Sequence, residues 1–157
     1  VPSDKKVESG EFVLMDFGAT YDGWHSDMTR TVCVGKPSDK MKSVYETVLT
    51  AQLSALDAVK AGMSGKALDK IARDIITEAG HGDNFGHSLG HGVGVEIHES
   101  PYASPSREDI LPENSIVTVE PGIYLEGKFG VRIEDFVVVT ENGCINMTKA
   151  PKELICL

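Results

Sequence analysis

The sequence is poor in basic residues and cysteines and has no long apolar run, and each shortage excludes a class of protein. Fifteen lysines and arginines stand against 24 acidic residues, a formal net charge of -9, so we expect no nucleic-acid partner. Its three cysteines are odd in number and lack the paired spacing of a zinc site or a disulfide framework, which favours a reducing, cytoplasmic setting. No apolar run approaches the length of a membrane span, so we expect no membrane association.

Several familiar catalytic motifs are missing as well. No His-Glu-x-x-His occurs, which excludes a zincin helix. Neither residues 62–66 nor the glycine-rich segment 85–101 completes the Walker spacing, and residues 90–94 lack the dinucleotide fingerprint. The start at Val1 has neither a signal-peptide pattern nor an initiator methionine, and we expect it to be an internal cut. With 157 residues, 41% of them hydrophobic, the chain is one globular domain or a large part of one.

A β-hairpin is predicted near the N-terminus. Residues 12–21 and 24–34 are strand-like runs, and the two residues between them, Asp22 and Gly23, are a strong signal for a two-residue turn. With this turn, Tyr21 pairs with Trp24. Every other pairing along the two strands follows from that register.

The hairpin register predicts that two carboxylates share one face. Gly18 falls opposite Asp27, and Asp16 lies two residues further along the same face. Such diagonal neighbours sit roughly 7–8 Å apart, close enough to converge on metal ions about 3.5–4 Å apart, and we expect Gly18 to leave the space between them open. A dication would relieve the repulsion between the carboxylates, although an ordinary solvated hairpin would show the same pattern.

Two helices are predicted next, and we expect both to be scaffold. Ser38 can cap the first, which ends at Gly62, and Ser64 can cap the second, which stops at Gly80. The inward face of the second helix is predicted to carry Leu68, Ile71, Ala72, Ile75 and Ala79.

A histidine-rich segment follows the helices. Residues 85–101 contain His87, His91 and His98 among several glycines. A lone histidine is usually structural, but this concentration is harder to dismiss, because glycines permit the close backbone approach that a metal or substrate needs.

Two further carboxylates lie on strands predicted at residues 116–120 and 131–140. Glu120 ends the first strand just before a turn, and Arg132 and Glu134 share one face of the second. Taken singly, either motif is more typical of an ordinary charge on a strand.

Taken together, these motifs resemble the pita-bread metallopeptidases, which include methionine aminopeptidase, Xaa-Pro aminopeptidase and Xaa-Pro dipeptidase (prolidase). The resemblance runs from about Pro2 to Thr140. It implies an α+β fold in which a curved antiparallel sheet is backed by helices. Residues 1–157 would be the C-terminal part of one such catalytic domain, truncated on its N-terminal side.

The resemblance also implies a set of metal ligands. Asp16 resembles a ligand of one metal ion, Asp27 and Glu134 resemble ligands that bridge both ions, and His91 and Glu120 resemble ligands of the other. Glu120 would also accept the proton of the attacking water.

The remaining site residues are implied in the same way. His98 matches the family's histidine that hydrogen-bonds the substrate and the tetrahedral intermediate. His87 resembles an extra histidine of the proline-specific branch and is expected to act in substrate binding and catalysis. Arg132 matches the Arg-Ile-Glu-Asp signature of that branch and is expected to bind substrate, which favours this branch over methionine aminopeptidase.

The cofactor and substrate follow from the resemblance. It implies two divalent metal ions, and oxygen-rich ligation with one imidazole suits manganese or cobalt, with zinc and iron left open. The implied substrates are short peptides with proline at the second position, hydrolysed before the proline by a homodimer of the full-length protein. Whether the enzyme acts as a dipeptidase or as an aminopeptidase stays open. A methionine aminopeptidase-like or other amide hydrolase, or a non-catalytic peptidase-like binding domain, is the alternative.

Overall fold

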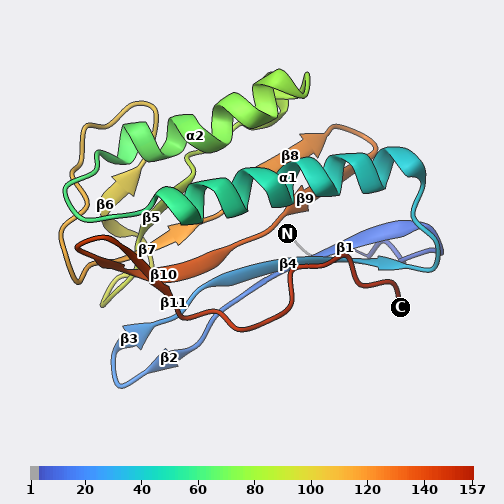
Figure 1. The fold of residues 1–157 in the computed structure, drawn as a ribbon. Coiled ribbons are helices and arrows are strands. Elements are labelled where there is room, and N and C mark those ends of the chain that lie inside the picture. The colour runs from blue at the N-terminus through green and yellow to red at the C-terminus, as the bar shows by residue number, and fades with distance from the viewer. Residues whose placement is uncertain (1–3) are drawn as a thin grey trace.

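The computed structural model describes residues 4–157 as two helices packed on antiparallel strands (Figure 1). The elements, in chain order, are β1 (Glu11–Phe17), β2 (Thr20–Tyr21), β3 (Trp24–His25), β4 (Met28–Val34), α1 (Asp39–Ala58), α2 (Gly65–Glu78), a 3₁₀ turn (Gly82–Asn84), β5 (Gly90–Gly92), β6 (Glu99–Ala103), β7 (Ile116–Val119), β8 (Gly122–Leu125), β9 (Phe129–Arg132), β10 (Asp135–Thr140) and β11 (Gly143–Asn146). The largest sheet has the order β11-β10-β7-β5-β6, and β1–β4, β2–β3 and β8–β9 form pairs. The expected α+β class is confirmed.

Both predicted helix caps are confirmed. The Ser38 hydroxyl accepts a hydrogen bond from the Met41 amide at the start of α1, and the Ser64 hydroxyl accepts one from the Ala67 amide at the start of α2. The helices lie side by side over the strands, and the hydrophobic core fills the space between these layers (Figure 1). Within residues 4–157, neither helix combines the length and apolarity needed to cross a membrane.

The predicted inward face of α2 is wrong at its last position. Ala79 is exposed because α2 ends at Glu78, which places Ala79 beyond the last helical residue. The buried stripe instead runs through Leu68, Ala72 and Ile76 at intervals of four residues, one above the other on a single face.

The predicted hairpin is confirmed in its turn and its register. Tyr21 pairs with Trp24, and β1 and β4 continue the same register beyond a short break. Asp22 and Gly23 have positive φ angles of 49° and 82°, as the mirror-image two-residue turn requires.

The role expected of Gly18 is wrong. The space beside it is filled, because a Cβ at Gly18 would lie 1.9 Å from the carbonyl oxygen of Ser26. The absence of a side chain lets the two backbones approach each other, and this fixes the chain just before Asp27.

The run predicted as one strand at residues 131–140 is two strands. β9 ends at Arg132 and pairs with β8, whereas β10 begins at Asp135 and pairs with β7 and β11. Between them, Glu134 makes an isolated bridge to Thr29, next to the start of β4. The chain therefore changes sheets at the position where a metal ligand is predicted.

Candidate metal centre and active-site pocket

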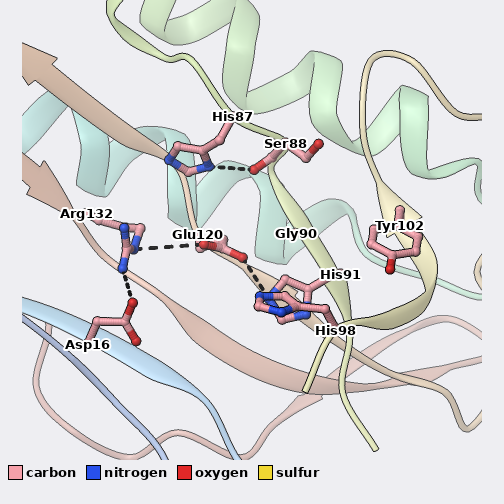
Figure 2. A pocket seen from close by; sticks show the side chains of 9 residues that line it. All are labelled: Asp16, His87, Ser88, Gly90, His91, His98, Tyr102, Glu120 and Arg132. Atoms are coloured by element: carbon pink, nitrogen blue, oxygen red, sulfur yellow. Dashed lines mark hydrogen bonds and ion pairs between the residues drawn. The ribbon is translucent and has the colours of Figure 1, made fainter. Parts of the chain in front are cut away.

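Three of the predicted metal ligands converge from separate elements. Asp27 precedes β4, His91 lies in β5 and Glu134 lies between β9 and β10. One donor atom from each lies within 4.8 Å of the others, and all three residues are buried. Glu120, directly after β7, extends the cluster, because its Oε1 is 3.2 Å from Nε2 of His91 (Figure 2).

Asp16 lies on β1 at the edge of this cluster. Its side chain is half exposed and forms an ion pair with the Arg132 guanidinium, whose Nε is 3.9 Å from Oε2 of Glu120 (Figure 2). Burial, and next the charge of Asp16, raise the pKa of Asp27. The two aspartates therefore act on each other electrostatically, as the hairpin register predicts.

The His91 imidazole is oriented as a metal ligand would be. Its Nδ1 donates a hydrogen bond to the Gly92 carbonyl at 3.0 Å, so Nε2 faces Glu120 and Asp27. A backbone bond of this kind fixes the tautomer of a ligating histidine and leaves the other nitrogen free to bind.

Hydroxyl groups orient two of the carboxylates. Thr29 donates to Oε2 of Glu134 at 2.6 Å, and Thr118 donates to Oε1 of Glu120 at 3.0 Å. These partners restrict the side-chain rotamers of both carboxylates, an arrangement typical of a preorganised metal site.

The electrostatics of the cluster fit a divalent cation. Burial, and next the charge of Glu120, raise the pKa of Glu134 to about 8, although the Thr29 hydrogen bond opposes this. Burial alone would lower the pKa of His91, but hydrogen bonds with Glu120 and the Gly92 carbonyl outweigh it and raise the pKa. Protons thus offset the crowded negative charge, a role that a dication ligated by carboxylates and one imidazole would take over.

These shifts predict that the stability of the metal-free protein depends on pH. Glu134 has a higher pKa folded than unfolded, so the folded state binds the extra proton and stability falls as pH rises from about 4.5 to about 8. The raised pKa of His91 acts in the same direction, because stability from a charged histidine is lost as pH rises. Denaturant unfolding between pH 5 and 9 measures the effect.

Glu134→Gln is the control for this pH prediction. The variant cannot ionise at position 134, so its stability should fall less steeply across the same pH interval. Saturating Mn²⁺ should flatten the wild-type profile of stability against pH, because the cation replaces the protons. If stability falls equally steeply with pH in the variant and in the metal-free wild type, the raised pKa of Glu134 is contradicted.

A cavity of about 520 Å³ opens beside the cluster and is large enough for a small peptide (Figure 2). Its lining consists of Asp16, His87, Ser88, Gly90, His91, His98, Tyr102, Glu120 and Arg132. The exposed ring of His98 packs against that of His91, with centroids 4.1 Å apart. The residues predicted to bind substrate therefore share one pocket with three of the five predicted metal ligands, Asp16, His91 and Glu120.

Sequence reasoning missed Tyr124, which connects two of the predicted substrate-binding residues. Its hydroxyl accepts from Nη1 of Arg132 at 3.0 Å and donates to Nε2 of His87 at 2.9 Å, while Nδ1 of His87 donates to the Ser88 carbonyl. The available signal was a hairpin pattern, two short runs with apolar residues around the glycine-containing loop at 126–128, which predicts β8 and β9.

This geometry defines a class of protein, in which antiparallel strands direct carboxylates and one imidazole toward a divalent-metal site beside a peptide-sized pocket. The model of metallopeptidase family M24 matches residues 1–141, and the chain belongs to that family. It is 53% identical over 155 residues to an Xaa-Pro dipeptidase of Pyrococcus furiosus, covering 99% of this chain and 44% of that protein.

Solved structures agree with the sequence comparison. An Xaa-Pro dipeptidase from Bacillus anthracis aligns with a TM-score of 0.97, and an X-Pro aminopeptidase from Thermotoga maritima aligns with a TM-score of 0.95. Each is 53% identical to this chain, and each alignment covers 99% of this chain and 44% of the other. The pita-bread fold is thus confirmed, and the chain spans less than half the length of these relatives.

Proposed function

We propose that this chain supplies the metal site of a dinuclear peptidase that cleaves between an N-terminal residue and proline. The convergence of Asp27, His91 and Glu134 carries the proposal, with Glu120 3.2 Å from His91. The names of relatives at about 50% identity supply the substrate class. Because those relatives are more than twice as long, we also propose that residues 1–157 are the C-terminal part of one catalytic domain.

In this proposal, Asp16, Asp27, His91, Glu120 and Glu134 hold two divalent ions, with manganese first. Asp16 would leave its ion pair with Arg132 to bind. When bound, the ions supply an activated water and polarise the scissile carbonyl. Glu120 would accept a proton from the attacking water and return it to the leaving nitrogen. His98, which lines the cavity beside His91, would donate a hydrogen bond to the developing oxyanion.

His87 and Arg132 line the cavity, are connected through the Tyr124 hydroxyl, and would position the substrate. The guanidinium and the phenol hydroxyl are joined by a hydrogen bond of 3.0 Å, and the phenol and the imidazole by one of 2.9 Å. The Arg132 guanidinium, held in place by Tyr124, suits the carbonyl and carboxylate oxygens of a short peptide.

The alternatives differ in how well the site supports them. A non-catalytic binding domain has no need of converging carboxylates. A methionine aminopeptidase-like enzyme would not be expected to be 53% identical to a relative named for Xaa-Pro substrates. Dipeptidase and aminopeptidase action stay alternatives, because relatives of both names are 53% identical. The homodimer and the cytoplasmic setting stay predictions.

The test uses the longer protein that contains this chain. Stripped of metal and reloaded separately with Mn²⁺, Co²⁺, Zn²⁺ or Fe²⁺, it should hydrolyse an Xaa-Pro dipeptide or an Xaa-Pro tripeptide, with the highest rate in Mn²⁺. A Met-Ala peptide of equal length is the matched control for proline selectivity. Faster cleavage of Met-Ala would contradict the substrate class, and full activity without metal would contradict the metal site.

A further inference from the structure

An ion pair on α2 lies behind the active-site pocket. Arg73 and Asp69 are four residues apart, and their side chains meet at two points, Nε to Oδ2 at 2.7 Å and Nη2 to Oδ1 at 2.9 Å. The Asp69 side chain is 1% exposed. Neither residue lines the described cavity.

Both members of the pair also hold the backbone of the histidine-rich segment. Arg73 donates from Nη1 to the Phe85 carbonyl at 2.9 Å and from Nη2 to the His87 carbonyl at 2.8 Å. Its guanidinium lies 4.2 Å from the centroid of the Phe85 ring. Asp69 accepts from the Leu89 amide at 3.0 Å. Such charge-assisted bonds are stronger than neutral ones, and Arg73 spreads several over one rigid plane.

The backbone segment that Asp69 and Arg73 hold is connected to two of the predicted site residues, His87 and Glu120. The His87 ring packs edge-on against Phe85 with centroids 5.0 Å apart, and its Nε2 meets the Tyr124 hydroxyl. The Leu89 carbonyl accepts from the Glu120 amide at 2.8 Å. A shift of this segment would therefore move His87 directly and Glu120 through one backbone hydrogen bond.

A second pair on the same helix makes no such connection. Lys70 and Asp74 have the same four-residue spacing and a distance of 2.6 Å, but their side chains are 71% and 52% exposed. Substitutions in this pair change the same helix without touching the pocket, so they are matched controls.

We propose that Asp69 and Arg73 are positioning residues for the reaction. Arg73 sets the position of His87 through the backbone carbonyls of residues 85 and 87, and Asp69 sets the position of Glu120 through Leu89. The catalytic part of this inference rests on the proposed Xaa-Pro hydrolysis, whereas the positioning part concerns the fold alone.

A double-mutant cycle tests the connection from Arg73 to His87. In the longer metal-loaded protein, Arg73→Lys keeps the charge but loses the planar fork, and kcat on an Xaa-Pro substrate should fall about tenfold, because misplacement by less than 1 Å has effects of this order. Bound Mn²⁺ should stay unchanged. In a His87→Ala background, the same substitution should lower kcat by less than about twofold. Lys70→Arg is the control and should leave kcat unchanged in both backgrounds.

Hydrogen exchange tests the connection from Asp69 without requiring activity. Asp69→Ala removes the acceptor of the Leu89 amide, so exchange at Leu89 and Glu120 should be about tenfold faster, the size expected for one bond to a charged group. Asp74→Ala is the control. If Asp69→Ala lowers overall stability, Asp69→Asn keeps an acceptor and should restore protection.

The outcomes separate the two proposals. An equal loss of kcat from Arg73→Lys with and without His87 would overturn the positioning role of Arg73. Unchanged exchange at Leu89 and Glu120 in Asp69→Ala would overturn that of Asp69. If Asp69→Ala speeds exchange as expected but the wild-type protein cleaves no Xaa-Pro peptide, the proposed function is overturned and the positioning by α2 stands.

Discussion

His91→Ala in the longer protein is expected to lose bound metal and peptidase activity together. His98→Ala should keep its metal and lower turnover by about 10²–10³-fold, as expected for loss of one donor to an oxyanion. The reason is geometric: Nε2 of His91 is directed at Glu120 and Asp27, whereas His98 lies exposed beside the His91 ring. Metal analysis of the purified variants and kcat on one Xaa-Pro substrate in excess Mn²⁺ measure both effects.

The two histidines serve as controls for each other. Their ring centroids are 4.1 Å apart, so each substitution removes an imidazole from nearly the same place. Release of metal by His98→Ala would show that its assigned role is wrong. Normal metal content in His91→Ala would remove it from the ligand set.

Asp135→Ala is expected to destabilise the fold by about 3–5 kcal/mol, because it leaves a buried charge without its partner. Asp135 is fully buried and accepts from Arg30 at 2.7 Å, Lys152 at 2.5 Å and Asn146 at 2.6 Å. Burial alone would raise the pKa of Asp135, but these three donors outweigh it and hold the pKa low. Arg30 also donates to the Glu134 carbonyl at 2.6 Å, so the loss should reach the metal cluster.

Glu108→Ala is the matched control for this prediction. Lys66 and Glu108 are also 2.7 Å apart, but their side chains are 53% and 72% exposed, and exposed pairs contribute only about 0–1 kcal/mol. Denaturant unfolding of both variants with and without Mn²⁺ gives the comparison. Similar losses from Asp135→Ala and Glu108→Ala would show that burial does not set the strength of the Arg30–Asp135 pair.

Features that depend on neighbouring residues were predictable from the sequence. The serine caps of α1 and α2 require one hydroxyl and one amide three residues away, and the hairpin turn requires two residues that tolerate positive φ. The order of carboxylates and histidines was specific enough to indicate the family, which the comparisons confirm. The roles assigned to the individual site residues stay predictions.

Other features could not be predicted because their causes lie far away along the chain. The strand predicted at 131–140 breaks because β9 and β10 pair with different partners, and no local signal at Ile133 or Glu134 marks that change. Tyr124 gains its role from His87, 37 positions before it, and Arg132, 8 positions after it. Gly18 is explained only by the backbone of the facing strand.

The sequence by itself determined the helix starts, the hairpin register and the residue types available for metal chemistry, because short-range hydrogen bonds and backbone sterics decide these features. Only the tertiary structure decided which of those residues meet. Asp27, His91 and Glu134 are brought together by β4, β5 and the gap between β9 and β10, segments that are distant in sequence and joined by sheet pairing and burial. The contacts of Asp69 and Arg73 have the same origin. The helix α2, predicted only as scaffold, packs where Arg73 reaches the His87 carbonyl and Asp69 reaches the Leu89 amide, and Leu89 in turn bonds the Glu120 amide.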